Sequence, residues 1–254
     1  GMTTGEAQAT LQSLRFADSV FITEYNRPVC LYAMLRAKSF AKIHNRQLVW
    51  TQAVDFPPRE HFGLYSADEL QKLKKKWLEP TYHAKKTEGV ASLLPLVYDM
   101  PLKVTGGQAA HCREQGIFKG SLCRLRAIDL HDEDRKRLAA TAATEVVLEY
   151  LPTALWVEMS RPLKNPLPNV PDNWFPLTPV TITWTLDKES CIEIKRKGFC
   201  VVPDFSSTIH SATGRELSGI EPDLGSFSAK PTYSSMMRGY IALSRVKDAA
   251  GLLI

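Results

Sequence analysis

The chain has 254 residues, 44% of them hydrophobic and 23% charged, and a formal net charge of +5. These are ordinary values for a globular protein, and the length suits one large domain or two small ones. The mild excess of positive charge permits a nucleic-acid partner without requiring one, and it excludes a polycationic protein that binds nucleic acid through bulk charge.

The five cysteines are scattered, odd in number and form no Cys-x-x-Cys pair. This pattern argues against a zinc site or a disulfide framework and favours free thiols in a reducing compartment. No apolar run resembles a signal peptide, and none approaches the roughly 20 apolar residues that span a bilayer. We therefore expect a soluble intracellular protein without a membrane partner, nuclear or mitochondrial in a eukaryote and cytoplasmic in a bacterium.

The first structured segment is expected at Ser19–Thr23, whose apolar and β-branched residues are typical of a buried parallel strand. Asn26 follows as a candidate N-cap, and Pro28 is tolerated in the first turn of the helix that this cap would begin. Helical spacing directs one face of that helix toward a core, with these residues: Val29, Tyr32, Leu35 (or Arg36), Phe40 and Ile43.

A further strand is expected within Gln47–Asp55. Ser66 and Glu69 then form a capping-box pattern before another helix, which carries Leu70, Leu73 and Trp77. This region is rich in lysine, at Lys72, Lys74–Lys76 and Lys85–Lys86. They form either a solvated basic face or a surface that contacts phosphates through charge and counterion release.

The pattern in the middle of the chain predicts a small β module. Leu93–Thr105 predicts two short strands broken at Asp99, and alternation predicts strands at Leu122–Leu130, Leu155–Met159 and Val180–Leu186. Asp132–Ala143 is either a short helix or an exposed loop. Pro162–Pro179 holds most of the local prolines and is interpreted as a linker or an extended strap.

The last third carries the most specific patterns. Lys195-Arg196-Lys197 precedes an apolar strand at Phe199–Val202, and Thr208–Leu217 predicts a short helix ended by Gly214. A longer helix follows, with Tyr233, Met237, Tyr240, Ile241 and Ser244 at spacings typical of one face. Arg245 is expected at the C-terminal end of this helix, and a turn at Lys247–Gly251 leads into a strand at Leu252–Ile254.

Two of these segments, Thr208–Leu217 and Tyr240–Val246, resemble the fifth and sixth motifs of superfamily 1 helicases of the Pif-type and RecD-like families. The family's sixth motif runs roughly Tyr-Val-Ala-Leu-Ser-Arg-Val, and Tyr-Ile-Ala-Leu-Ser-Arg-Val stands here. The fifth runs roughly Thr-Ile-His-Lys-Ser-Gln-Gly-x-Thr-Leu. This chain keeps Thr208, Ile209, His210, Gly214 and Leu217, but has Ser211, Ala212 and Thr213 where the family has Lys, Ser and Gln.

The resemblance implies an α/β fold: a RecA-like (P-loop NTPase-type) second motor domain with a parallel sheet, in two parts at 15–108 and 200–254. A small β-rich, SH3-like module at 109–199 interrupts it, and the Phe199–Val202 strand re-enters the motor domain. The first strand and Asn26 are similar to the fourth motif, in which an Asn contacts nucleic-acid backbone. Asn26 acting only as a helix cap is the alternative.

The implied activity is that of the C-terminal half of an ATP-dependent DNA helicase, a hydrolase that moves 5′ to 3′ on single-stranded DNA and serves repair, recombination and telomere maintenance in the family. The resemblance implies that Asn26, Thr208, His210 and Gly214 bind the strand, and that Gly214 and Arg245 serve the nucleotide site. Arg245 would be the arginine finger, an effect of about 10³–10⁵ in rate elsewhere. The alternatives are a core histidine for His210 and a helix C-terminal cation for Arg245.

The Gly-x-x-x-x-Gly-Lys-Ser/Thr loop that cradles phosphates is absent from the sequence, as is an acidic strand end to hold Mg²⁺. We therefore expect ATP and Mg²⁺ to bind only in a complete two-domain motor, and this chain alone to be inactive. Its expected partners are single-stranded DNA and a first motor domain. The rival hypotheses are a non-catalytic nucleic-acid-binding protein derived from a helicase half and a protein-interaction module.

Overall fold

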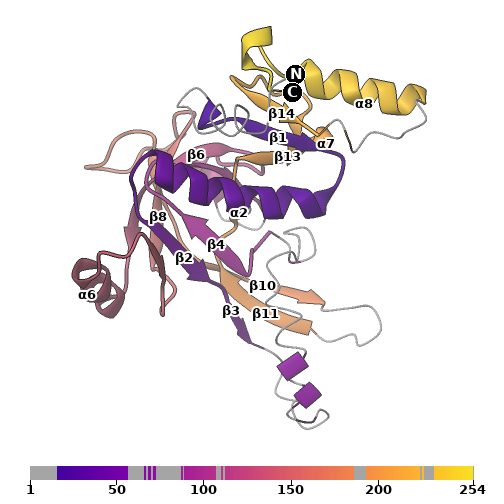
Figure 1. The fold of residues 1–254 in the computed structure, drawn as a ribbon. Helices are drawn as coiled ribbons and strands as arrows, with labels where there is room; N and C mark the ends of the chain where they lie inside the picture. Colours follow the sequence, from indigo (N-terminus) through magenta and orange to yellow (C-terminus); the bar gives the residue numbers. More distant parts are fainter. Residues whose placement is uncertain are drawn as a thin grey trace. The chain divides into compact units, whose positions relative to one another are not determined.

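The computed structural model describes residues 16–56, 66, 68–69, 71–72, 87, 89–106, 110, 112–185, 193–223, 225 and 232–253. The chain divides into two units: unit 1 comprises residues 1–46 and 203–254, and unit 2 comprises residues 47–202. Helices accompany both parallel and antiparallel sheets, so the predicted α/β class is confirmed at this level (Figure 1).

Unit 1 is built on a parallel sheet of three strands in the order β13-β1-β14. β1 spans Val20–Thr23, β13 spans Ser206–Thr208 and β14 spans Ile220–Pro222. The predicted parallel strand at the start of the chain is thus confirmed, because both neighbours of β1 run parallel to it. Leu252 continues the sheet beyond β14 through a parallel bridge to Ile220, whereas Ile254 lies outside the described residues.

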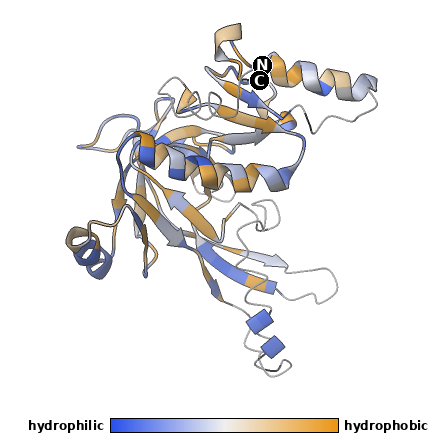
Figure 2. Cartoon of the chain, viewed as in Figure 1, coloured by the Kyte–Doolittle hydropathy of each residue, from blue (hydrophilic) through white to orange (hydrophobic). Residues whose placement is uncertain are grey.

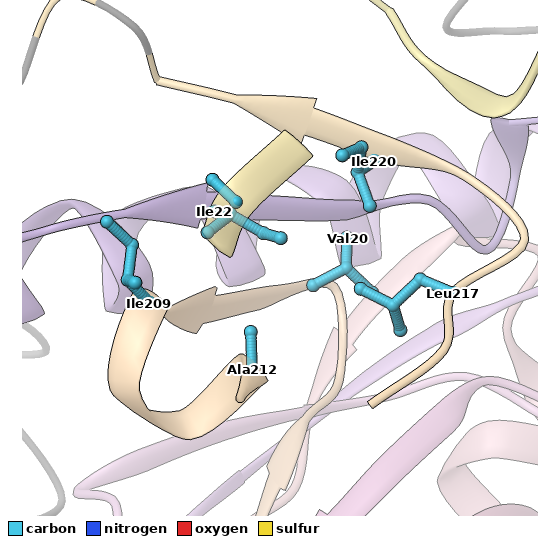
Figure 3. Close-up of a cluster of buried hydrophobic side chains, with 7 residues drawn as sticks. Val20, Ile22, Ile209, Ala212, Leu217 and Ile220 are labelled. Atoms are coloured by element: carbon cyan, nitrogen blue, oxygen red, sulfur yellow. The ribbon is translucent and has the colours of Figure 1, made fainter. Parts of the chain in front are cut away.

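Among its described residues, unit 1 has the helices α2 (Asn26–Ile43), α7 (Ile209–Ala212) and α8 (Tyr233–Leu243), and the 3-10 turn η4 (Ala249–Gly251) precedes Leu252. A cluster of buried side chains joins the sheet to α7 and α8 (Figure 3): Val20, Ile22, Ile209, Ala212, Leu217, Ile220 and Ala242. Burial of each large aliphatic side chain contributes about 1.5–3 kcal/mol, so this cluster stabilises unit 1 substantially.

The inward face of α2 agrees with the expectation in part, because Val29, Tyr32 and Ile43 are only half-buried. Ala33, Ala37 and Phe40 are buried on it, and Arg36 is buried while Leu35 is 64% exposed. Of the two residues that the sequence offered at this position, Arg36 therefore faces the core.

The residues that share one face of α8 by spacing are mostly exposed. Tyr233 is 81% exposed, Tyr240 67% and Met237 41%, whereas Ala242 is fully buried. Spacing indicates that a helix has two unlike faces, but the element packed against the helix decides which face is buried. Here Ala242 packs into the cluster and Ile241 packs against it, so the covered side of α8 lies around these two residues.

The described residues of unit 2 form three sheets. β2 (Leu48–Gln52) lies between β4 (Leu93–Leu96) and β7 (Glu145–Val147), antiparallel to the first and parallel to the second. A five-stranded sheet has the order β12-β5-β6-β8-β9. Its strands are β5 (Pro101–Val104), β6 (Leu122–Asp129), β8 (Ala154–Met159), β9 (Trp174–Leu177) and β12 (Val201–Pro203). The third, β10-β11-β3, joins β10 (Val180–Thr185), β11 (Glu193–Gly198) and β3 (Val54–Phe56).

Most of the strands predicted in this region are confirmed, including the break at Asp99, whose φ is 67°. The single strand expected within Gln47–Asp55 is instead two, β2 and β3, in different sheets. The segment after His131, expected as a short helix or an exposed loop, contains a helix, α6 (Asp132–Ala140). A 3-10 turn, η2, spans Arg113–Gln115.

Two expectations for unit 2 are wrong. The Pro162–Pro179 strap contains β9, which is an edge strand; an edge tolerates Pro176 because one side of the strand donates no ladder hydrogen bond. The strand expected at Phe199–Val202 is Val201–Pro203, and it lies beside β5 in the five-stranded sheet. The sheet of unit 1 is instead re-entered by β13.

The division into units does not coincide with the predicted boundary at residue 108. Residues 47–108 belong to unit 2, because β2 pairs with β7 and β5 pairs with β6. Gly198 ends β11 against close neighbours: a Cβ there would lie 2.7 Å from Val90 Cγ1 and 3.1 Å from Ala53 Cβ.

Ser66 and Glu69 form the predicted capping box, with the Ser66 amide donating to Glu69 Oε2 at 2.8 Å and the Glu69 amide donating to Ser66 Oγ at 3.3 Å. Backbone and hydroxyl hydrogen bonds from Ser66 lower the pKa of Glu69. Lys72 is exposed, but the other predicted basic residues of this region lie outside the described residues. Among the described residues, no helix is long and apolar enough to cross a bilayer.

Candidate nucleic-acid and nucleotide site

The carboxyl ends of β1 and β13 bring three predicted site residues to one edge of the sheet. The two strands are parallel neighbours, with Thr23 directly opposite Thr208. Asn26 follows Thr23 by three residues, and His210 follows Thr208 by two. In open α/β sheets this edge is where ligands bind, because the connecting loops there can carry side chains outward.

Asn26 does not cap α2, so that interpretation is wrong. The N-cap residue is Tyr25, which makes no side-chain capping bond, and Asn26 is the first helical residue. A β-region backbone at Tyr25 (φ −106°, ψ 142°) places the helix start one residue earlier than the sequence pattern indicated. Asn26 is exposed, and its side chain therefore lies at the surface of the sheet edge.

Thr208 and His210 begin the short helix of the fifth-motif segment. Thr208 is the N-cap of α7, and its Oγ1 accepts from the Ser211 amide at 3.4 Å and pairs with Ser211 Oγ at 3.1 Å. His210 is exposed. The alternative of a core histidine is therefore wrong, and the imidazole faces solvent.

The three residues that depart from the family pattern are used for local structure. Ser211 pairs with Thr208, and Ala212 is fully buried in the apolar cluster. Thr213 Oγ1 donates to the Ile209 carbonyl at 3.1 Å. None of these side chains extends as the long Lys and Gln of the family pattern would.

Gly214 ends α7 as predicted, with φ 78° in the left-handed region that glycine adopts without steric cost. The chain then turns toward the amino ends of the strands, and Arg215 forms a two-bond pair with Asp204 at 3.1 and 2.5 Å. Figure 3 shows Ile209 on the side of Ile22 and Leu217 beside Val20, at opposite ends of β1.

Arg245 lies at the end of the sheet away from Asn26 and His210. Leu217 pairs with Val246, and the Leu217 amide donates to the Arg245 carbonyl at 2.8 Å. The Arg245 guanidinium folds back along α8: Nε donates to the Ile241 carbonyl at 3.0 Å and Nη2 to Ser244 Oγ at 2.8 Å. It therefore bonds one last-turn carbonyl as a helix C-terminal cation does, and Nη1 is a further donor group of the same guanidinium.

A buried polar group lies beneath α2 that the sequence did not suggest. The Ser19 hydroxyl donates to Glu221 Oε1, and Arg36 Nη2 lies 3.8 Å from the same oxygen and donates to the Phe16 carbonyl. Burial raises the pKa of Glu221 to about 7, opposed by the Ser19 hydrogen bond. Burial also lowers the pKa of Arg36. Only an acidic residue inside the apolar Ile220–Pro222 run hinted at this arrangement.

Among the described residues, no group of three or more His, Cys, Asp or Glu side chains is placed to hold a metal ion.

No protein-family model and no curated protein matches the sequence. Among solved structures, the chain resembles the Pif1 helicase from Candida albicans with a TM-score of 0.53 and 16% sequence identity, over 99% of this chain and 50% of that one. It also resembles the Pif1 helicase from Bacteroides in complex with ADP-AlF3 and ssDNA, with a TM-score of 0.50 and 13% identity, over 99% and 45% of the two chains. The chain has the fold of about half of a Pif1 helicase. The predicted resemblance to Pif-type helicases is thereby confirmed at the level of the fold.

Proposed function

We propose that the chain is the second motor half of a Pif-type, ATP-dependent DNA helicase that moves 5′ to 3′ on single-stranded DNA. In this proposal unit 1 is the RecA-like part and unit 2 carries the inserted, SH3-like module. A first motor domain, in the same parent protein or in another chain, supplies the phosphate-cradling loop and the Mg²⁺ ligands.

The observation that carries the proposal is the meeting of Asn26, Thr208 and His210 at one edge of a parallel sheet. All three come from segments that resemble strand-contacting motifs, and the register of β1 and β13 places them together. A Pif1 helicase of similar fold is known in complex with ssDNA and ADP-AlF3. Asn and His donors at such an edge suit phosphate oxygens, which carry most of the affinity for a single strand.

In this proposal the nucleotide and the strand bind at different places on unit 1. Arg245 lies at the opposite end of the strands from Asn26 and His210, which supports separate nucleotide and strand contacts. When ATP and Mg²⁺ are bound by a first motor domain, a guanidinium stabilises charge on the transferring phosphoryl group. To do so, Arg245 must exchange its bond to the Ile241 carbonyl for one to phosphate.

Binding of a fluorescein-labelled single-stranded oligonucleotide across a salt series, without ATP, tests the strand-binding half of the proposal. We expect affinity to fall with salt, and to fall a further ~2- to 10-fold in His210→Ala and in Asn26→Ala, since each loses about one hydrogen bond. Ser218→Ala, an exposed change near the other end of the strands, is the matched control. Equal affinity in the wild type and all three variants refutes strand binding at this edge of the sheet.

The nucleotide half requires a first motor domain. We expect stimulated ATP hydrolysis in the mixture, lost by about 10³-fold or more in Arg245→Ala, while oligonucleotide binding is retained. Lys247→Ala removes a nearby exposed cation and should leave the rate unchanged. Stimulation that survives Arg245→Ala contradicts the arginine-finger role.

A non-catalytic nucleic-acid-binding protein is the second candidate function. The observation that favours it is the use of Ser211, Ala212 and Thr213 for capping and packing, since the family's Lys and Gln at this place link strand to nucleotide. Oligonucleotide binding together with no ATPase stimulation by any first motor domain would select this candidate.

A further inference from the structure

The sheet β10-β11-β3 of unit 2 has one buried and one exposed face. Burial alternates along β11, so that Ile194, Arg196 and Gly198 point inward while Glu193, Lys195 and Lys197 point outward. The same alternation along the neighbouring strands exposes a set that we call the basic sheet face: Val54, Phe56, Thr181, Thr183, Thr185, Glu193, Lys195 and Lys197. Figure 2 shows hydrophilic residues along most of β11.

The buried side of this sheet determines its register. Arg196 forms a two-bond ion pair with Asp55, with distances of 2.6 and 2.9 Å, and its guanidinium lies 4.9 Å from the Trp184 ring centre. Because successive side chains of a strand point to opposite faces, locking Arg196 inward holds Lys195 and Lys197 outward. The outer face is therefore presented by a rigid element.

The cross-strand partners on the outer face are mixed in chemistry. Lys195 lies directly opposite Phe56 on one side and Thr183 on the other, and Lys197 lies opposite Val54 and Thr181. Directly opposed Cβ atoms are about 4.5–5.5 Å apart, and the two lysines are about 6–7 Å apart along β11. Phe56 is 52% exposed although it is a large aromatic side chain. Glu193 stands at the far end of the row, opposite Thr185.

We propose that the basic sheet face binds single-stranded nucleic acid. The two ammonium groups contact successive phosphates, the Phe56 ring stacks on an unpaired base, and the threonine hydroxyls donate to phosphate oxygens. An unpaired strand suits this face better than a duplex, because a ring can stack only on a base that has left its pair. Glu193 repels phosphate and confines the backbone to the end of β11 that carries Lys195 and Lys197.

This surface is additional to the site in the proposed function, which consists of residues of unit 1. It needs neither a nucleotide nor a first motor domain. The lysines act as point charges, and a ring such as Phe56 can stack on any of the bases. The face would therefore bind a strand without sequence specificity.

The full chain and a fluorescein-labelled oligothymidylate, without nucleotide, provide the test. In Lys195→Gln/Lys197→Gln we expect the slope of log affinity against log salt to fall by about 1.4, since each phosphate contact to a single strand contributes about 0.7. Lys119→Gln/Lys136→Gln, two exposed lysines elsewhere in unit 2, is the matched control with the same loss of charge. Thr183→Arg adds a cation beside Lys195 and should strengthen binding.

Phe56→Ala tests the stacking. We expect about 5- to 100-fold weaker binding to the oligothymidylate and no change with an abasic oligonucleotide of equal length, because only the former offers bases. All these side chains are exposed or half-exposed, so urea unfolding should match that of the wild type.

The proposal is overturned if Lys195→Gln/Lys197→Gln binds like its control, or if polyglutamate of equal charge displaces the oligonucleotide as well as unlabelled oligothymidylate does. His210→Ala is measured in parallel to separate the two sites. Loss of oligonucleotide affinity in His210→Ala alone overturns the basic sheet face and supports the site proposed in unit 1. Loss in the lysine variant supports the face, whatever His210→Ala does.

Discussion

The buried pair of Arg196 and Asp55 offers a strong test of how unit 2 is held together. Arg196 is fully buried and the Asp55 side chain is 5% exposed, and they meet through two hydrogen bonds of 2.6 and 2.9 Å. Asp55→Ala removes both hydrogen bonds that the carboxylate accepts from the buried guanidinium, while Trp184 and the Val90 carbonyl, 3.4 Å from Nη1, stay beside it. We expect a loss of about 3–5 kcal/mol in the free energy of unfolding, because removal of one partner of a buried ion pair keeps the other charge in the interior without the attraction of its pair.

The double variant Asp55→Ala/Arg196→Met separates the loss of a contact from the burial of a charge. A thioether of similar length fills the space without a charge, so much of the stability lost in Asp55→Ala should return. All five tryptophans of the chain lie between residues 47 and 202, so urea unfolding followed by tryptophan fluorescence reports on unit 2. The reasoning fails if Asp55→Ala costs less than about 1 kcal/mol, or if the double variant is no more stable than the single one.

Three further predictions concern stability. The folded state keeps the Glu221 proton up to about pH 7, whereas an unfolded carboxyl releases it near 4.5, so unit 1 should lose stability as pH rises between these values. The loss of stability is at most about 3 kcal/mol, because Arg36 at 3.8 Å opposes it. Glu221→Gln should remove this pH dependence in urea unfolding followed by circular dichroism at pH 5 and pH 7.5. If the variant keeps the pH dependence of the wild type, Glu221 is not its source. Gly251→Ala should destabilise unit 1 by about 1–3 kcal/mol, since its Cβ would lie 2.3 Å from the Ser218 carbonyl oxygen. Gly214→Ala, with open space around its Cβ, should cost only about 1–2 kcal/mol of backbone strain, and thermal unfolding that ranks the two the other way would refute the packing argument. Asp134 is buried and accepts from the Glu149 and Tyr150 amides at 3.2 and 2.9 Å, so Asp134→Ala should cost about 3 kcal/mol by tryptophan-monitored unfolding, against no change for the exposed Asp132→Ala.

Features that depend on neighbours in the sequence were predicted well. The apolar run of β1, the glycine end of α7 at Gly214 and the capping box of Ser66 and Glu69 each involve residues only a few positions apart. Their physics is local: strand propensity, left-handed backbone freedom and hydrogen bonds within one turn. The resemblance to Pif-type helicases, made on two short motifs, likewise agrees with the fold.

Errors occurred where a partner distant in the sequence decides the outcome. The period of α8 was recognised but its buried side was not, because Ala242 rather than Tyr240 meets the core cluster. The strap after Pro162 proved to contain β9, because β8 offered an open edge with which Trp174–Leu177 could pair.

The amino-acid sequence determined the elements and the residue types available for chemistry, because both follow from local conformational preference and from composition. Tertiary structure alone decided which of these residues meet. The parallel register of β1 and β13 gathered Asn26 with Thr208 and His210, and the return of α8 along the sheet put Arg245 at its other end. Pairing across long loops joined Arg196 to Asp55, 141 residues apart, and Glu221 to Ser19, 202 residues apart. Such contacts depend on strand order and on burial of the whole apolar surface, which no short stretch of sequence specifies.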